Sequence, residues 1–403
     1  MPNSAVFGPF ASSVAGGTTP VCQLFPSSCV WCASSHVNVR SRRHWKKRRQ
    51  AAVTLSSSRS FGRYGNREAT LFILSNGSIE AAVTDYGAIL VSLEVPDRSG
   101  RLSPVLLGFD DVAAYAETRG SFGAVLGRNA NRIAGGKIEI DGRVYPLAKN
   151  EPNATLHGGP VGFGKCFWSV ASVEPTRLIL ALSSPDGDQG FPGEVKVTAM
   201  YGIEDNELHL VFDATTTKPT PVTLSAHPYF NLAGVGAADC LDHRVEIVAS
   251  HFLPTDEHQI PTGEIAAVAD TPFDFRKPWP IGARIRENHP QLRYGRGYDH
   301  YFILPQDDTG QVRRAAWIES AKSGRVLEIL TTQPGLQFYS GNNLDGAISG
   351  RGGLYRQSAG FAFEPQGFPD APNRRNFPST TLRPGERYHE EIVYRFSIAE
   401  QRS

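Results

Sequence analysis

Two histidines and two carboxylates stand in sequence surroundings that suit a site for chemistry. His157 precedes two glycines, and His227 precedes a proline and two aromatic residues. Glu364 lies between an alternating apolar run and a proline-rich loop, and Asp299 is followed by His300. A carboxylate can accept a proton while an imidazolium donates one, and each such positioned group typically contributes about 10²–10⁴-fold to a rate. These residue types therefore allow general acid and base chemistry.

Each of these side chains also has a structural interpretation. His227 suits a buried histidine bonded to the backbone, His157 an ordinary loop histidine, and Asp299 a surface pair with His300. Glu364 suits a solvent-facing carboxylate at the end of a strand. A metal site built from His157, His227, Asp299 and Glu364 is a further alternative, because these ligand types suit zinc or manganese. Their wide separation in the sequence offers no close-spaced ligand pair, which argues against a metal.

The segments around these residues predict strands. From about Phe61 onward, short runs that alternate polar and apolar residues are separated by clusters of Gly, Pro, Asn and Asp, a pattern typical of antiparallel strands with one packed face. Lys137–Ile140 and Arg143–Tyr145 flank Asp141-Gly142, a turn pair that favours a hairpin. Further runs of this kind are Glu194–Thr198, Glu207–Phe212, Arg244–Val248 and Arg325–Leu330.

The run of strands predicts one continuous domain over residues 61–403. We find no internal repeat and no Ser/Gly linker in this region. Many half-buried strands with few helical patterns predict an all-β fold, a large antiparallel β-sandwich with few short helices. Short helices are expected at residues 111–115 and around residues 281–287.

The distribution of charge disfavours nucleic-acid binding. Lys and Arg number 41 and Asp and Glu number 40, but ten of the basic residues lie within residues 1–67, which hold no acid. The remaining 31 basic residues stand against all 40 acids, so the rest of the chain carries a formal charge of −9. An acidic body is a poor partner for nucleic acid. No run of about 18 apolar residues occurs, so no membrane partner is expected.

Residues 1–60 have the composition of a disordered organelle transit peptide. Residues 1–39 contain no Lys, Arg, Asp or Glu, and a basic run follows from Arg40 to Arg49. Acid-free, Ser-rich leaders that contain arginine are typical of organelle import. The late onset of positive charge favours a plastid (chloroplast), with the mitochondrion and the cytoplasm as alternatives. A nuclear signal, a disordered tail or a mispredicted start are other interpretations of this segment.

The short motifs of nucleotide binding, zinc proteases and α/β-hydrolases are missing from the sequence. The glycines of His157–Gly164 are followed by neither a Lys-Ser/Thr pair nor a helical run, so a tight loop is favoured over a phosphate site. Cys29 and Cys32 form a C-x-x-C spacing, but no second Cys or His pair follows nearby. We therefore expect no cofactor and no metal.

Segments distributed in order along the chain resemble the aldose 1-epimerase (galactose mutarotase) family. Any one of them alone is weak evidence, but together they cover nearly all of residues 68–396. The segments are Gly127–Lys137 (GRNANRIAGGK), Asn153–Gly159 (NATLHGG), Leu224–Leu232 (LSAHPYFNL), Leu253–Thr255, Ile260–Gly263, Phe273–Arg276, Gly297–Phe302 (GYDHYF), Gln333–Asn342 (QPGLQFYSGN) and Gly360–Asn373 (GFAFEPQGFPDAPN).

The resemblance implies an enzyme that interconverts the α and β anomers of free aldohexoses such as galactose and glucose. Glu364 falls at the family's catalytic glutamate and would take the anomeric proton as general base. His227 would protonate the ring oxygen as general acid. The implied partner is a small-molecule sugar, and the implied assembly is a monomer or weak dimer that needs no cofactor. The residues implied in sugar binding are Asn131, Arg132, His157, Tyr229, Asp299 and Gln337, with Phe230 beside Tyr229 in the cleft wall.

Several details of the resemblance stay open at this point. Ala226 stands where the family often has Asn, which should change rate or substrate preference without removing the chemistry. Arg132 also suits a structural pair with an acid on a neighbouring strand. A carboxylate such as Asp299 or Glu364 near His227 would raise the pKa of that histidine and keep it protonated. The rival functions are a mutarotase for hexose 6-phosphates and a catalytically silent sugar-binding module.

Overall fold

The computed structural model describes residues 57–306 and 309–400. Apart from residues 57–60, the predicted transit peptide therefore lies outside the described residues. Strand β1 (Ser57–Tyr64) spans the predicted domain boundary at residue 61, so the folded body begins before that boundary. Among the described residues, no helix is long and apolar enough to cross a membrane.

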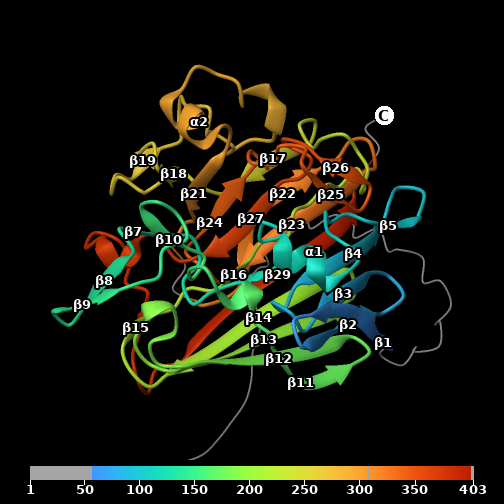
Figure 1. The fold of residues 1–403 in the computed structure, drawn as a ribbon. Coiled ribbons are helices and arrows are strands. Elements are labelled where there is room, and N and C mark those ends of the chain that lie inside the picture. Colours follow the sequence, from blue (N-terminus) through green and yellow to red (C-terminus); the bar gives the residue numbers. More distant parts are fainter. Residues whose placement is uncertain (1–56, 307–308, 401–403) are drawn as a thin grey trace, which may run out of the picture. The chain divides into compact units, whose positions relative to one another are not determined.

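The described chain folds as antiparallel sheets, which confirms the predicted all-β class (Figure 1). Alternating side chains let one face of each strand pack while the other meets solvent or a site. The largest sheet has nine strands. In order across the sheet these are β11 (Ser169–Glu174), β12 (Arg177–Ser184), β13 (Val195–Glu204), β14 (Glu207–Thr216), β29 (Tyr388–Ile398), β23 (Arg325–Thr331), β22 (Arg313–Glu319), β17 (Arg244–Ile247) and β20 (Trp279–Pro280).

Two further sheets have five strands each. The first contains β1, β2 (Arg67–Ser75), β3 (Glu80–Thr84), β4 (Leu90–Pro96) and β5 (Leu102–Pro104). The second, which we call the site sheet, contains β19 (Ala266–Ala267), β18 (His251–Leu253), β21 (Asp299–Ile303), β24 (Gly335–Tyr339) and β27 (Ala362–Gln366).

Short two-stranded pairs complete the described sheets. They are β10 (Ala154–Leu156) with β7 (Arg132–Ala134), β15 (Thr220–Pro221) with β28 (Thr381–Leu382), β16 (Ser225–Ala226) with β6 (Val125–Leu126), β25 (Ile348–Gly350) with β26 (Gly353–Tyr355), and β8 (Lys137–Ile140) with β9 (Arg143–Pro146).

The predicted hairpin is confirmed as β8 and β9, and the other predicted strand segments coincide with β13, β14, β17 and β23, except that the predictions for β13 and β17 each include one residue outside the strand, Glu194 and Val248. The first predicted helix is α1 (Val112–Glu117), which is capped by Asp111 accepting from the N–H of Ala114 at 2.9 Å. The second predicted helix is only a 3₁₀ turn, η3 (Ile281–Ala283). The sequence analysis missed α2 (Pro290–Gly295), although Pro at the first helical position is a known start signal. Three other 3₁₀ turns are η1 (Phe163–Lys165), η2 (Asp188–Gly190) and η4 (Ala371–Asn373).

The main hydrophobic core joins the site sheet to the nine-stranded sheet. Phe338 of β24 stacks on Phe363 of β27 at a centroid distance of 4.7 Å. The same core cluster includes Phe212 of β14 and Tyr394 of β29, and all four side chains are buried. The odd and even positions of each strand point to opposite faces. The apolar positions of β24 and β27 therefore face the core and leave the alternate positions to form the site.

Candidate active site

Three adjacent strands of the site sheet bring polar side chains to one face. Asp299 begins β21, Gln337 lies in β24, and Glu364 lies in β27. Gln337 is the cross-strand partner of Glu364, and Asp299 is the partner of Tyr339, which shares a face with Gln337. Gln337 Nε2 donates to Asp299 Oδ1 at 2.6 Å. The register of the sheet therefore places two carboxylates and an amide side by side.

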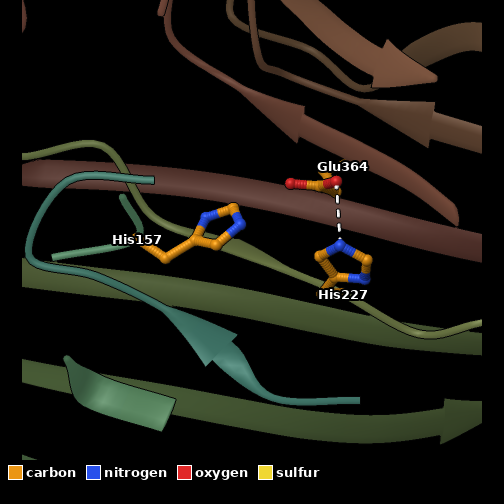
Figure 2. Close-up of side chains that lie close together, drawn as sticks. All are labelled: His157, His227 and Glu364. Carbon is orange, nitrogen blue, oxygen red and sulfur yellow. Dashed lines mark ion pairs between the residues drawn. The ribbon is translucent and has the colours of Figure 1, made fainter. Parts of the chain in front are cut away.

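His227 meets Glu364 directly. Glu364 Oε1 lies 3.3 Å from His227 Nε2, and the two side chains are only 3% and 7% exposed (Figure 2). His227 follows β16, where its N–H donates to the carbonyl of Ala124 at 3.0 Å. Phe230 and Phe361 exchange two backbone hydrogen bonds of 2.7 and 2.9 Å, which hold the His227 segment against β27. Glu364 is thus buried beside an imidazole, not exposed at a strand end.

His157 is the third side chain at this point. It follows β10, and its ring centroid lies 5.8 Å from that of His227 (Figure 2). The N–H of Asn131 donates to His157 Nδ1 at 3.1 Å, and the His157 N–H donates to the Asn131 carbonyl at 3.1 Å. Because Nδ1 accepts a hydrogen bond, the neutral ring carries its proton on Nε2. In Figure 2 one ring nitrogen of His157 points toward Glu364 and His227, so this ring offers a donor to the site.

Arg132 begins β7 and is paired with an acid, as one interpretation of the sequence expected. Its Nε and Nη2 donate to Glu151 Oε2 and Oε1 at 2.8 and 3.0 Å, a bidentate geometry. Arg132 and Glu151 also line a cavity of about 300 Å³, together with Gln259 and Tyr294. A cavity of this size is at the lower end of the range for small-molecule sites. Neither His227 nor Glu364 lines this cavity, but Arg132, which does, interacts electrostatically with Glu364.

Tyr229 covers the pair on another side, as expected for a wall residue. Its ring lies 4.7 Å from that of His227 and 4.5 Å from that of Phe122. Phe230 was expected in the same wall, and that expectation is wrong. Phe230 is fully buried and packs on Phe361 and Tyr394 in the main core. Successive residues of an extended segment point to opposite sides, so only one of the two aromatic rings can face the cleft.

Burial dominates the electrostatics of the carboxylates. Burial raises the pKa of Glu364 well above its usual value; nearby Asp299 raises it further, and Arg132 opposes the rise. Burial also raises the pKa of Asp299, while Arg132 and Gln337 lower it. For Arg132, burial lowers the pKa, but Asp299 and Glu151 outweigh burial and raise it. The Arg132 guanidinium therefore favours the ionised forms of both Glu364 and Asp299 against the effect of burial.

Burial keeps the two histidines of the site neutral near pH 7. Burial lowers the pKa of His227 to about 4, and burial with the nearby His227 and Arg132 lowers the pKa of His157 well below its usual value. The expectation that nearby carboxylates would raise the pKa of His227 is therefore wrong, because its pKa is lowered. Glu364 is close enough to attract a charged ring, but removal of both groups from water costs more than that attraction returns.

The chain matches the family model described as "Aldose 1-epimerase" over residues 70–395. It belongs to the aldose 1-epimerase family. The predicted family, and with it the predicted class of enzyme, a carbohydrate epimerase, are confirmed. The match spans all of the site residues described above.

Relatives of this epimerase bear the same family name or that of galactose mutarotase. The chain is 44% identical to the galactose mutarotase of Bos taurus over 333 residues, which cover 81% of this chain and 94% of the relative. It is 38% identical to the aldose 1-epimerase of Escherichia coli, with 82% and 95% covered. Among solved structures, an aldose epimerase homologue from C. elegans superposes with a TM-score of 0.75 at 30% identity, covering 82% of this chain and 100% of the homologue.

Three of the four residues of the alternative metal site lie close together. Among the described residues, His157, His227 and Glu364 offer ligand atoms that all lie within 4.8 Å of one another, whereas Asp299 is not part of this group. However, the Asn131 N–H occupies Nδ1 of His157, so the proton sits on the nitrogen that faces the site. A metal ligand needs a free lone pair at that nitrogen. The epimerase therefore presents a hydrogen-bond donor here where a metal would require an acceptor.

Four residues of the epimerase site were missed by the sequence analysis. Tyr339 lies two residues after Gln337 on the same strand, so the period of two identifies it as a site residue; its ring is 6.0 Å from that of His227. Gln259 forms a side-chain hydrogen bond with Asp299, and nothing in its loop sequence signals this. The other two are carboxylates, Glu151 and Asp370, whose contacts with the Arg132 strand depend on tertiary folding.

Proposed function

We propose that this epimerase interconverts the α and β anomers of free aldohexoses such as galactose and glucose. The Glu364 carboxylate takes the proton of the anomeric hydroxyl while protonated His227 gives a proton to the ring oxygen. The bond between the anomeric carbon and the ring oxygen breaks, and an open-chain aldehyde forms. Rotation about the bond between the first two carbons presents the other face of the carbonyl. Reversal of both proton transfers closes the ring as the opposite anomer, and nothing is consumed.

The direct contact of Glu364 with His227 is the single observation that carries this proposal. A proton on Glu364 and a neutral His227 convert into a carboxylate and an imidazolium by one transfer across the 3.3 Å contact. Burial disfavours both ionic forms. A sugar that donates its hydroxyl to the carboxylate and accepts from the imidazolium replaces lost hydration and stabilises the ionic form. The pair can therefore reach its reactive ionic form without a proton from water.

The remaining site residues would hold the sugar hydroxyls. His157 offers the N–H of its fixed tautomer, and Arg132 offers guanidinium hydrogens at the cavity wall. Asp299 and Gln337, joined by their 2.6 Å hydrogen bond, offer both an acceptor and a donor to neighbouring hydroxyls. Asn131 fixes His157 through its backbone N–H and carbonyl, and its side-chain oxygen accepts from the N–H of Arg132 at 2.8 Å. Tyr229 supplies an apolar wall.

Anomer exchange measured by NMR tests the proposal. We expect added enzyme to accelerate exchange between α-galactose and β-galactose, and between the glucose anomers, above the spontaneous rate. Glucose 6-phosphate, assayed in parallel, separates the free-sugar activity from the rival activity on phosphorylated hexoses. Activity confined to the phosphate would overturn our choice of substrate. Binding of sugars without any acceleration would favour the silent binding module.

We also propose that residues 1–60 direct the epimerase to a plastid and that it works as a monomer or weak dimer. The acid-free, Ser-rich composition supports the first proposal. The second follows from the resemblance to the family. Microscopy of a fluorescent fusion to residues 1–60 tests the location, and signal in mitochondria or the cytoplasm would contradict it. Sedimentation of the protein at several concentrations tests the assembly, and a tight dimer or larger oligomer would contradict it.

A further inference from the structure

Arg132 is bonded at both ends by acidic residues, at its side chain by the carboxylate of Glu151 and at its backbone by the N–H of Asp370. At its side chain, Glu151 accepts from Nε and Nη2 at 2.8 and 3.0 Å. At its backbone, the carbonyl oxygen of Arg132 accepts from the N–H of Asp370 at 2.9 Å. The carboxylate of Asp370 reaches further along β7, where Oδ1 accepts from the N–H of Ala134 at 2.9 Å. Two acids that are distant in sequence therefore fix one arginine.

The carboxylate of Asp370 connects its own loop to strand β7. Its side chain is fully buried, and its Oδ2 accepts from Arg374 Nε at 2.8 Å while Asn373 Nδ2 donates to Oδ1 at 2.8 Å. Its φ is 57°, in the left-handed region that non-glycine residues adopt rarely. Asp370 follows the strand that carries Glu364. The loop that leaves the base is thereby fastened to the strand that carries Arg132.

Glu151 fixes the orientation of the guanidinium. An arginine side chain has many rotamers, and a bidentate carboxylate selects one plane for its five N–H groups. Two N–H groups are used by Glu151, and no hydrogen bond of the described residues uses Nη1. Arg132 also lines the cavity of about 300 Å³ described above, and it interacts electrostatically with both Asp299 and Glu364. The Arg132 side chain is 11% exposed and that of Glu151 is 28% exposed, so the pair lies at the edge of the site and not on the open surface.

We propose that Glu151 and Asp370 are positioning residues that act through Arg132, aiming its free guanidinium hydrogens at a sugar hydroxyl. The inference rests on the proposed function, since it concerns how the aldohexose is held. Arg132 would bind the sugar in both the ground state and the transition state. A loss of its aim should therefore weaken substrate binding and leave the proton transfers between Glu364, His227 and the sugar largely intact.

The variant Glu151→Gln tests the side-chain contact. It keeps the size of the side chain but removes the charge and one of two acceptor oxygens, so we expect KM for galactose to rise about tenfold and kcat to change by less than about threefold. The matched control is Asp141→Asn, which breaks the bidentate pair of Asp141 with Arg383 at 2.8 and 3.0 Å on the β8–β9 hairpin turn. The control should leave both constants unchanged.

A double-mutant cycle shows whether the effect passes through Arg132. In the Arg132→Ala background, Glu151→Gln should raise KM no further, because the group that it positions is gone. Asp370→Asn should behave in the same way, and its unfolding midpoint is measured alongside. A loss of folding in Asp370→Asn would show a purely structural residue and overturn that half of the proposal.

Each outcome separates this inference from the proposed function. A wild-type protein that accelerates no anomer exchange would overturn both. An active wild type with an unchanged KM in Glu151→Gln would overturn the positioning role alone. An equal rise of KM in the wild-type and Arg132→Ala backgrounds would also overturn it, because Glu151 would then act independently of Arg132.

Discussion

At the scale of single residues, the site holds a carboxylic acid and a neutral imidazole where the chemistry requires their ionic forms. Burial raises the pKa of Glu364 well above its usual value and lowers the pKa of His227 to about 4. The two groups are 3.3 Å apart, so their titrations are coupled and one proton belongs to the pair. The proposed chemistry runs with this one shared proton, whichever partner carries it before the sugar binds.

The pH dependence of kcat/KM follows from that shared proton. A second proton must bind His227, whose lowered pKa places this step at about pH 4, so activity is lost only as the pH falls to about that value. Loss of the shared proton sets the alkaline limb, because the pKa of Glu364 is raised. We therefore expect activity to reach its plateau by about pH 5 and the alkaline limb to lie above the usual pKa of a glutamate. The measurement is galactose anomer exchange at low substrate concentration, with the spontaneous rate subtracted at each pH.

An acid limb near the pKa of about 6.5 of an ordinary histidine would contradict this assignment. Such a limb would mean that His227 is solvated in the working enzyme, or that another histidine limits the rate.

At the scale of elements, the register of the site sheet and the loop that carries His157 position the site residues. Strands β21, β24 and β27 deliver Asp299, Gln337 and Glu364 through ordinary antiparallel pairing. His157 comes instead from a loop end in the left-handed region, with φ of 52°. The glycine that follows it also has a positive φ and passes close to another backbone segment. This loop has no room for an added Cβ at Gly158.

Gly158→Ala should therefore impair both folding and activity. A Cβ at this position would lie 2.0 Å from the carbonyl oxygen of Gly127, at φ of +88°. The loop must move, and His157 moves with it, so we expect a loss of about 1–3 kcal/mol in the free energy of unfolding and a fall in kcat/KM. Urea unfolding and anomer exchange measure the two effects.

Gly142→Ala serves as the control for backbone strain. Its φ is +78°, but an added Cβ meets nothing within 4 Å. This variant should lose stability by about 1 kcal/mol and keep full activity. Equal effects of the two variants on activity would show that the packing of the His157 loop does not matter.

At the scale of the whole molecule, the sequence predicted elements better than their contacts. Alternation predicted the β8–β9 hairpin and four strands, because the period of two is local information. The eight proposed site residues were located by resemblance, and the structure brings Glu364, His227 and His157 into one cluster. Local patterns could not reveal the pairing of Arg132 with Glu151. They also could not show that burial outweighs charge at His227, since burial is a property of the folded chain.

Buried histidines outside the site should make stability depend on pH. His243 is 2% exposed, its Nε2 accepts from the N–H of Leu232 at 3.0 Å, and burial lowers its pKa to about 4. Below about pH 6.5, His243 is protonated in the unfolded chain but stays neutral in the folded protein. Stability is therefore lost as the pH falls through that value. His243→Gln keeps an acceptor without titrating. As the pH falls from 7 to 5, the free energy of unfolding of this variant should rise by about 2 kcal/mol relative to that of the wild type.

A constant difference between wild type and His243→Gln over this pH range would contradict the neutral, buried state of His243. Chemical unfolding at pH 7, 6 and 5 supplies the comparison, and the acids with raised pKa values affect both proteins equally.

The turnover of Glu364→Gln tests the central claim most directly. The amide keeps the shape of the side chain but cannot take the anomeric proton, so exchange of the galactose anomers by NMR should slow by about 10²–10⁴-fold with the unfolding midpoint retained. A folded Glu364→Gln protein that exchanges anomers at near the wild-type rate would contradict a reaction driven by the Glu364 and His227 pair.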